Sequence, residues 1–235
     1  MGGVTLDHVS ADEMTSRPLR KDAERSRRRV LEAARELFAA KGLEPNLNDV
    51  AHHAGVGVGT VYRRFGTKED LLESIFEDAL DQLAVMAESS LCEEDSWLAL
   101  TQFVEQMCEV TATDRGLREI AFSKCYGGVR VTAAQDRLGP LLAKVVERAQ
   151  NDGYLRPELS FADMPIFSLL AGTVSEFAGH VDAGLWRRYI AMLLDGMRQR
   201  SDQGQLPVDA LDKSALDVAM QSWEPAGRPV GRART

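Results

Sequence analysis

Glycine, tyrosine and basic residues that can contact phosphate are concentrated between Gly55 and Asp70, in the sequence GVGVGTVYRRFGTKED. A glycine-rich loop can cradle a nucleotide, but Gly55, Gly57 and Gly59 do not form GxGxxG, and no GKS or GKT follows them. Both nucleotide loops also follow a β-strand, whereas the residues before Gly55 have helical spacing. The glycines therefore predict a turn. Any contact with an anion is expected from the side chains that follow them.

Two short helices are predicted to flank this turn. Asn46 is the expected N-cap of the first helix and Gly55 its stop. In the second helix, Val58, Val61 and Phe65 are expected to share one face. Two short helices joined by a glycine turn indicate a helix-turn-helix, whose second helix suits the DNA major groove. The first helix is predicted from apolar residues at helical spacing, namely Leu47, Val50, Ala51 and Ala54.

The charge of the chain is unevenly distributed. Its net charge is -8, yet Arg17–Lys68 holds 12 Lys and Arg against six Asp and Glu, a net +6, whereas residues 69–235 carry -11. A further amphipathic helix with arginines in its first turns is predicted over Arg20–Lys41, with Gly42 as its stop. A basic N-terminal region followed by an acidic remainder is typical of a small polyanion-binding domain carried by a larger module.

These motifs resemble the TetR family of bacterial transcriptional regulators. The resemblance covers residues from about 20 to 80 and rests on the paired alanines before an aromatic residue, on A-G-V-x-x-G-T-x-Y-x-x-F, and on K-E-x-L-L. The sequence departs from the family where Asn46 replaces a frequent Thr, Gly57 a frequent Ser and Arg64 a frequent His. Because Gly57 lacks a hydroxyl, any phosphate contact there must come from backbone N–H groups.

The expected DNA-contacting surface follows from the motif and the resemblance together. Arg63 is the best candidate for a base edge, since arginine can form two hydrogen bonds with guanine. Tyr62, by its resemblance to the family's phosphate-binding tyrosine, and Lys68 are expected to reach phosphates. A bound phosphate would also explain a cation in the first turn of a helix, where the helix dipole disfavours it. The full expected set is Arg28, Asn46, Asn48, Gly57, Val58, Gly59, Thr60, Tyr62, Arg63, Arg64 and Lys68.

Beyond Gly66 the sequence predicts helices almost throughout, with no strand alternation and no internal repeat. The expected fold is all-α: an N-terminal three-helix helix-turn-helix DNA-binding domain followed by a helical dimerisation and ligand-binding domain. The expected boundaries are a flexible arm over 1–18, the DNA-binding domain over 19–66, the effector-binding and dimerisation domain over 67–200, and a tail over 201–235.

A homodimer is expected through two strongly apolar helices near residues 161–178 and 185–199, because both are too apolar for surface helices. A symmetric dimer would place two recognition helices one duplex turn apart and require a pseudo-palindromic site. The expected interface residues are Ile166, Val174, Phe177, Ile190, Leu193, Leu194 and Met197.

The family resemblance also implies a small, mainly apolar effector bound inside the helices from about 70 to 180. Core packing is the competing interpretation of the same apolar side chains. The expected lining residues are Trp97, Phe103, Met107, Phe122, Tyr126, Leu142, Phe167, Leu170 and Glu176.

Other function classes have little support. Cys92, Cys108 and Cys125 form no CxxC pair, the adjacent His52 and His53 diverge on a helix, and GxSxG and HExxH are absent. No apolar run approaches the roughly 20 residues of a membrane span, so a cytoplasmic protein without membrane contact, cofactor or metal is expected. The alternative is an all-helical ligand-sensing or protein-interaction module without DNA binding, which the basic N-terminal region argues against; an enzyme is more distant.

Overall fold

The computed structural model describes the backbone of residues 11–121 and 128–222, and the side chains from Arg25 onward within these ranges. Regular structure there is helical, apart from an isolated β-bridge between Leu155 and Arg198, so the all-α prediction is confirmed. None of the helices in these ranges combines enough length and apolar character to cross a lipid bilayer. The elements are α1 (Ala11–Lys41), α2 (Leu47–Ala54), α3 (Val58–Phe65), α4 (Lys68–Leu91), α5 (Ser96–Thr113), α6 (Arg115–Ala121), α7 (Val129–Asn151), the 3-10 helix η2 (Phe161–Asp163), α8 (Met164–Ala178), α9 (Leu185–Met197) and α10 (Lys213–Ser222).

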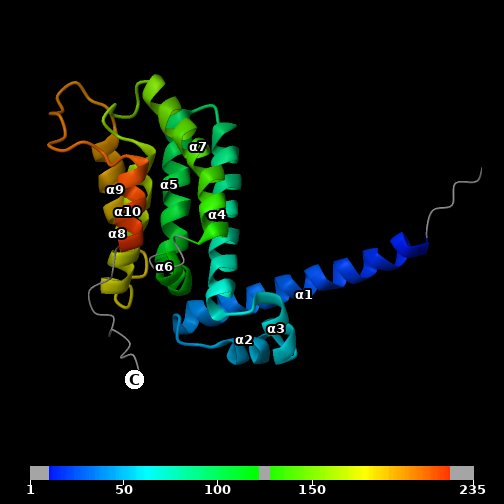
Figure 1. Cartoon of the computed structure of the whole chain (residues 1–235). Helices are drawn as coiled ribbons and strands as arrows, with labels where there is room; N and C mark the ends of the chain where they lie inside the picture. The colour runs from blue at the N-terminus through cyan, green and yellow to red at the C-terminus, as the bar shows by residue number, and fades with distance from the viewer. Residues whose placement is uncertain (1–10, 122–127, 223–235) are drawn as a thin grey trace, which may run out of the picture.

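Helices α1, α2 and α3 form a small unit at one end of the molecule, below the other helices in Figure 1. Helix α2 packs against α1, and α3 packs against α2 and α4. The apolar positions of these helices converge on a core that includes the fully buried Val30, Val50 and Val61. Helix α1 begins at Ala11, inside the segment expected to be an arm, and its N-terminal half extends away from α2 and α3 (Figure 1).

The remaining helices form a bundle in which α4 runs along α7, α5 along α8, and α8 along α9. Leu100 and Phe103 of α5 and Ile120 of α6 are fully buried at its centre. Helix α7 continues through Pro140, although proline lacks the N–H that a helix interior uses. We attribute this continuity to packing, because Leu138 and Leu142 on either side of the proline are both buried in the core.

Helix α10 lies within the stretch expected to be a tail. Its Lys213 Nζ donates a hydrogen bond to Asp136 Oδ1 of α7 over 3.2 Å, and Leu216 is buried. The segment leading to α10 is held by Arg156, whose Nη2 donates to the carbonyl of Gly204 over 2.7 Å. The chain after α9 therefore returns onto the body of the protein.

Candidate nucleic-acid interface and effector cavity

Helix α2 begins at the N-cap predicted from sequence. The Asn46 side chain accepts hydrogen bonds from the backbone N–H groups of Asn48 and Asp49, at 2.8 and 3.2 Å. The Asp49 carboxylate in turn accepts from the Asn46 N–H at 2.8 Å, completing a capping box. This reciprocal pair satisfies amide groups that the helix start would leave unpaired, and it fixes where α2 begins.

The turn between α2 and α3 depends on Gly55. This residue has φ 63° and ψ 36°, in the left-handed region that residues other than glycine rarely adopt. Its N–H donates to His52 O at 3.1 Å, and the Val56 N–H donates to Ala51 O at 3.0 Å. These two bonds are those of a Schellman motif, so the predicted helix stop is confirmed and the direction of α3 is set by backbone geometry.

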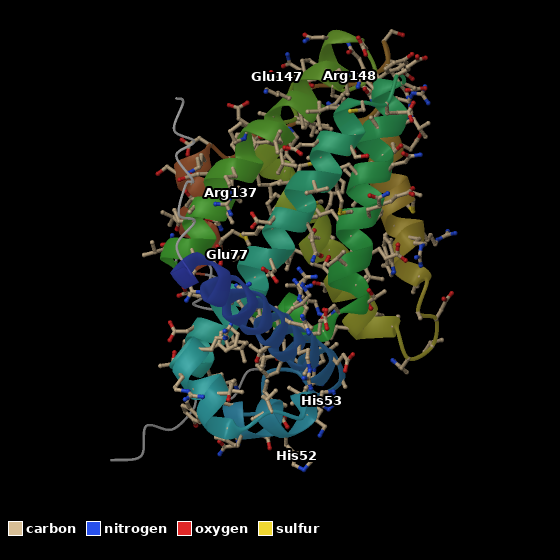
Figure 2. The ribbon with its side chains drawn as sticks, turned by 90° about the vertical axis from the view of Figure 1, so that its right-hand side faces the viewer. His52, His53, Glu77, Arg137, Glu147 and Arg148 are labelled. Carbon is tan, nitrogen blue, oxygen red and sulfur yellow. The ribbon has the colours of Figure 1, made fainter. Side chains whose placement is uncertain are left out.

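Two side chains also tie α2 to α1. Arg29 Nη2 donates to the carbonyl of Ala54 over 3.0 Å, adding a cation at the C-terminal end of α2, where the helix dipole favours it. His53 Nε2 lies 3.0 Å from Glu36 Oε2. Figure 2 shows His52 and His53 at the end of the molecule that carries the small N-terminal unit. Arg29 was not among the expected site residues, although its position directly before the buried Val30 of α1 was visible in the sequence.

Helix α3 buries one face and exposes the other. Val61 and Phe65 are buried against α2 and the start of α4, whereas Tyr62 is 47% exposed and Arg63 is exposed. Val58, which the spacing placed on the buried face, is 44% exposed. The spacing was correct but Val58 is the first residue of α3, beyond the packed part of the turn. The exposed face thus presents an aromatic hydroxyl, a guanidinium and an apolar side chain.

The N-terminal end of α3 has no side-chain cap. Gly57 is the N-cap residue with φ -64° and ψ 137°, and the Thr60 N–H donates to its carbonyl at 2.8 Å. The remaining first-turn amides can therefore serve an external acceptor. Thr60 and Arg64 are half-buried, and the other expected contact residues here are exposed, namely Arg28, Asn46, Asn48, Gly57, Val58, Gly59, Tyr62 and Arg63. Their contact with DNA stays a prediction.

Lys68 is placed differently from the expected phosphate contact. Its Nζ donates a hydrogen bond to the carbonyl of Leu43, just after α1, and lies 5.9 Å from the centre of the Phe38 ring. Burial lowers the pKa of Lys68 below its usual value, against the opposing fields of Glu69 and Asp49. Because this ammonium group points into the junction between α1 and α4, it needs no phosphate to explain its position in the first turn of α4.

Helix α6 holds the backbone N–H of the same residue, Leu43. Glu119 Oε2 accepts from the N–H of Leu43 at 2.9 Å, and Glu119 Oε1 accepts from Arg115 Nε at 2.8 Å. Gly116 packs so closely on α1 that a Cβ there would lie 2.6 Å from the backbone carbon of Phe38. The end of α1 is therefore bound by α4 on one side and by α6 on the other.

A small cavity of about 60 Å³ lies among α4, α5, α6 and α8, and we call it the α4–α8 cavity. Its walls are almost wholly apolar. Leu117 and Ala121 line it from α6, the helix that also contacts α1. The lining residues are Phe76, Ala79, Gln82, Leu83, Met86, Met107, Val110, Thr111, Leu117, Ala121 and Ser168.

Met107 is the expected ligand-contacting residue that lines this cavity. Phe103, Leu142 and Phe167 are instead buried in the packed core, and Leu170 is 40% exposed on α8. Phe122 and Tyr126 lie outside the described residues. Sequence reasoning missed the α4 wall because its residues were assigned to core packing. Their spacing was the available signal, since Phe76, Ala79, Leu83 and Met86 recur at helical spacing along α4.

The two remaining members of the expected pocket have other neighbours. Trp97 packs under the guanidinium of Arg198, whose Cζ lies 5.3 Å from the Trp97 ring centre and 5.9 Å from that of Tyr154. Glu176 is exposed on α8, where its charge faces Arg118 of α6. Neither residue lines the α4–α8 cavity, and their contact with an effector stays a prediction.

The expected dimer residues divide into two groups. Ile190, Leu194 and Met197 are at most 5% exposed within one protomer, so their assignment to an interface is corrected: α9 turns this face toward α8 and the core. Ile166, Leu193 and Phe177 are 39%, 37% and 81% exposed, and Val174 is half-buried. Alternation at helical spacing explains the division, because one face of each helix must pack inward.

Two family descriptions match the chain. "Bacterial regulatory proteins, tetR family" matches residues 30–75, and "Transcriptional regulator SbtR-like, C-terminal domain" matches residues 96–199. An HTH-type transcriptional regulator of Staphylococcus aureus is 41% identical over 64 residues, which cover 27% of this chain and 35% of that protein. The chain therefore spans about a third of the length of this curated relative.

Solved structures extend the similarity to most of the chain. The TetR transcription regulatory protein from Mycobacterium vanbaalenii is 31% identical, with a TM-score of 0.55, and the match covers 77% of this chain and 100% of that one. A TetR transcriptional regulator from Streptomyces coelicolor is 24% identical, with a TM-score of 0.55 and coverage of 74% and 99%. The first similarity thus spans more than two thirds of both chains.

Proposed function

This chain belongs to the TetR family of bacterial DNA-binding transcriptional regulators, and we propose that it represses transcription from a pseudo-palindromic operator as a homodimer released by a small, mainly apolar ligand. The observation that carries the proposal is the exposed face of α3. Tyr62 and Arg63 stand on a short helix whose start and direction are fixed by the Gly55 turn. A helix so presented suits the major groove, with Arg63 toward base edges and Tyr62 toward phosphate.

Exposed apolar stripes on α8 and α9 support the homodimer. Ile166, Leu170 and Phe177 recur along α8 at helical spacing and are all exposed, and Leu193 with Met192 is exposed on the adjacent α9. Apolar side chains gathered in this way commonly mark a protein interface. A two-fold pair of α8 and α9 helices would place the two α3 helices for half-sites about 34–36 Å apart.

Helix α6 supports a link between ligand and DNA. One part of it, Leu117 and Ala121, lines the α4–α8 cavity, while Gly116 and Glu119 hold α1. A ligand that shifts α6 would therefore shift the end of α1 and change the separation of the two α3 helices. Such a ligand opposes DNA binding only to the extent that it prefers the altered arrangement.

The test is an electrophoretic mobility shift with the DNA that flanks the chain's own gene, against scrambled DNA of equal length. We expect a discrete complex with two protomers per site, and a reporter under this DNA should be repressed by the protein. Light scattering at micromolar concentration should show a dimer that Phe177→Glu weakens. Val181→Glu is the control, because Val181 is equally exposed but lies in the turn after α8. Equal binding of both DNAs, or a monomeric parent, would refute the proposal.

A further inference from the structure

We propose that the α4–α8 cavity selects uncharged ligands that carry one hydroxyl group on a compact apolar body. The inference rests on the proposed function, in which this cavity receives the effector, and adds the chemistry of what it receives. It depends on three features of the lining: the absence of charged side chains, two hydroxyl groups that can form hydrogen bonds with a ligand, and the available volume.

No charged side chain contributes to the described lining of the cavity. A carboxylate or ammonium group placed there would lose its hydration without gaining an opposite charge, which is strongly unfavourable. The nearest candidate cation is Arg118 of α6, but its Nη1 donates to the carbonyl of Thr111 over 2.8 Å. Its aliphatic part packs on α8, where a Cβ on Gly172 would lie 2.5 Å from Arg118 Cδ. The contacts of the Arg118 side chain are therefore with the Thr111 carbonyl and with α8, and Arg118 is not among the lining residues.

Two hydroxyl groups give the lining its polar character. Ser168 of α8 is 8% exposed and lines the cavity, which places its hydroxyl where it can donate to a bound ligand. The Thr111 hydroxyl of α5 donates to the carbonyls of Met107 and Cys108 at 3.3 and 3.1 Å, so its lone pairs remain as acceptors. A ligand hydroxyl can accept from Ser168 and donate to Thr111. A ligand carbonyl can accept a hydrogen bond from Ser168 but has no proton to donate to Thr111. A hydrocarbon can form a hydrogen bond with neither residue.

The volume favours a compact ligand. The cavity measures about 60 Å³, and a cavity of about 150 Å³ holds benzene, so a single ring requires some expansion. Met86 of α4 and Met107 of α5 both line the cavity, and methionine side chains adapt readily because they are unbranched and flexible. Gln82 is exposed and lies where the cavity meets solvent. We therefore expect one ring or a similarly short chain.

Four compounds that differ only in the group attached to a benzene ring test the inference: toluene, benzyl alcohol, benzoate and benzylammonium. Calorimetry and thermal shift on the full chain should give benzyl alcohol about five- to tenfold tighter binding than toluene, the ratio expected for one added neutral hydrogen bond. Benzoate and benzylammonium should bind at least a hundredfold more weakly than benzyl alcohol. Binding of either ion as tight as that of the alcohol would overturn the inference.

Variants locate the binding. Ser168→Ala and Thr111→Val should each lower the ratio of benzyl alcohol to toluene affinity at least twofold while leaving toluene affinity unchanged. Ser175→Ala is the matched control on α8, since its hydroxyl donates to the carbonyl of Ala112 rather than facing the cavity, and it should keep the parental ratio. An unchanged ratio in both cavity variants would refute the assignment of these hydroxyls.

The same samples separate this inference from the proposed function. If the parent binds operator DNA but none of the four compounds, the ligand class is wrong and the DNA-binding proposal stands. If benzyl alcohol binds with the expected preference but operator affinity does not change, the ligand class is supported and the release mechanism fails.

Discussion

The Glu119 carboxylate of α6 accepts a hydrogen bond from the N–H of Leu43, the residue that follows the turn at the end of α1, over 2.9 Å. Replacing Glu119 by Ala removes this acceptor and the partner of Arg115. We expect the free energy of unfolding to fall by about 1–2 kcal/mol, because a partly buried N–H loses a charged acceptor. We also expect ligand to change operator affinity less than in the parent, since α6 no longer holds α1. Urea unfolding and mobility shift with and without ligand measure the two effects.

Glu119→Gln and Glu147→Ala are the controls for this prediction. Glutamine keeps an acceptor oxygen for Leu43, so it should retain most of the coupling. Glu147 lies on α7 at the opposite end of the molecule from the helix-turn-helix (Figure 2), and its loss should change neither property. If Glu119→Ala responds to ligand like the parent, α6 does not transmit the signal through this bond.

Arg63→Ala should relax sequence preference. Arg63 is exposed on α3, and a bidentate arginine–guanine contact discriminates by about 1–3 kcal/mol. The ratio of operator to random-DNA affinity should therefore fall at least fivefold, measured by competition mobility shift. Arg188→Ala, at an exposed arginine on α9, should leave the ratio unchanged. A parental ratio in Arg63→Ala would remove Arg63 from the proposed base contacts.

Lys68→Met should act on stability rather than on phosphate contact. Lys68 donates to Leu43 O inside the protein, so its loss should lower the free energy of unfolding by about 1–2 kcal/mol. The slope of log affinity against log salt should stay parental, whereas Arg64→Ala should reduce this slope by about one unit. A reduced slope in Lys68→Met with parental stability would restore the phosphate contact first expected from sequence.

Gly116→Ala should separate α6 from α1. The added Cβ would lie 2.6 Å from the Phe38 backbone, and rigid backbone on both sides leaves no flexible atom to yield. Overpacking of this kind costs about 1–3 kcal/mol. Gly196→Ala is the matched control in α9, because no heavy atom lies within 4 Å of the added methyl group; it should be neutral or slightly stabilising. Equal unfolding free energies for the two variants would contradict the close packing.

Thiol reactivity should distinguish Cys108 from Cys92. Burial raises the pKa of Cys108 to about 12, with a smaller contribution from Glu105, whereas Cys92 is exposed at the end of α4. The thiolate is the reactive form, so Cys108 should resist a disulfide reagent at pH 8 until the protein unfolds. In a Cys125→Ser background, native protein should release one equivalent of chromophore quickly and a second in denaturant. Two fast equivalents would show that α5 opens readily.

Local signals predicted the helix-turn-helix well because its elements are specified by neighbouring residues. The Asn46 cap and the Gly55 turn each depend on residues within about one helical turn, and both are confirmed. The contact between Lys68 and Leu43 was not predicted because Leu43 is distant in sequence and is brought near only by the packing of α1 on α4.

The helical bundle was harder to predict in detail. Helical spacing identified α8 and α9 as apolar but could not say which face of each packs inward, so Leu194 and Leu193 were both assigned to an interface although only Leu193 is exposed. The cavity depends on how four helices diverge from one another. The spacing of apolar residues within a single helix carries no information about that arrangement. Met107 was expected among its lining residues, and the α4 wall around Leu83 was not.

The backbone N–H of Leu43 offers a way to observe the junction in solution. It donates to Glu119 of α6 and takes no part in a helix of its own. Amide hydrogen exchange at this residue should therefore be slow only while α6 is docked on the end of α1, and should accelerate when α6 departs. A single amide can then report the state of the junction by NMR before any operator or effector is known.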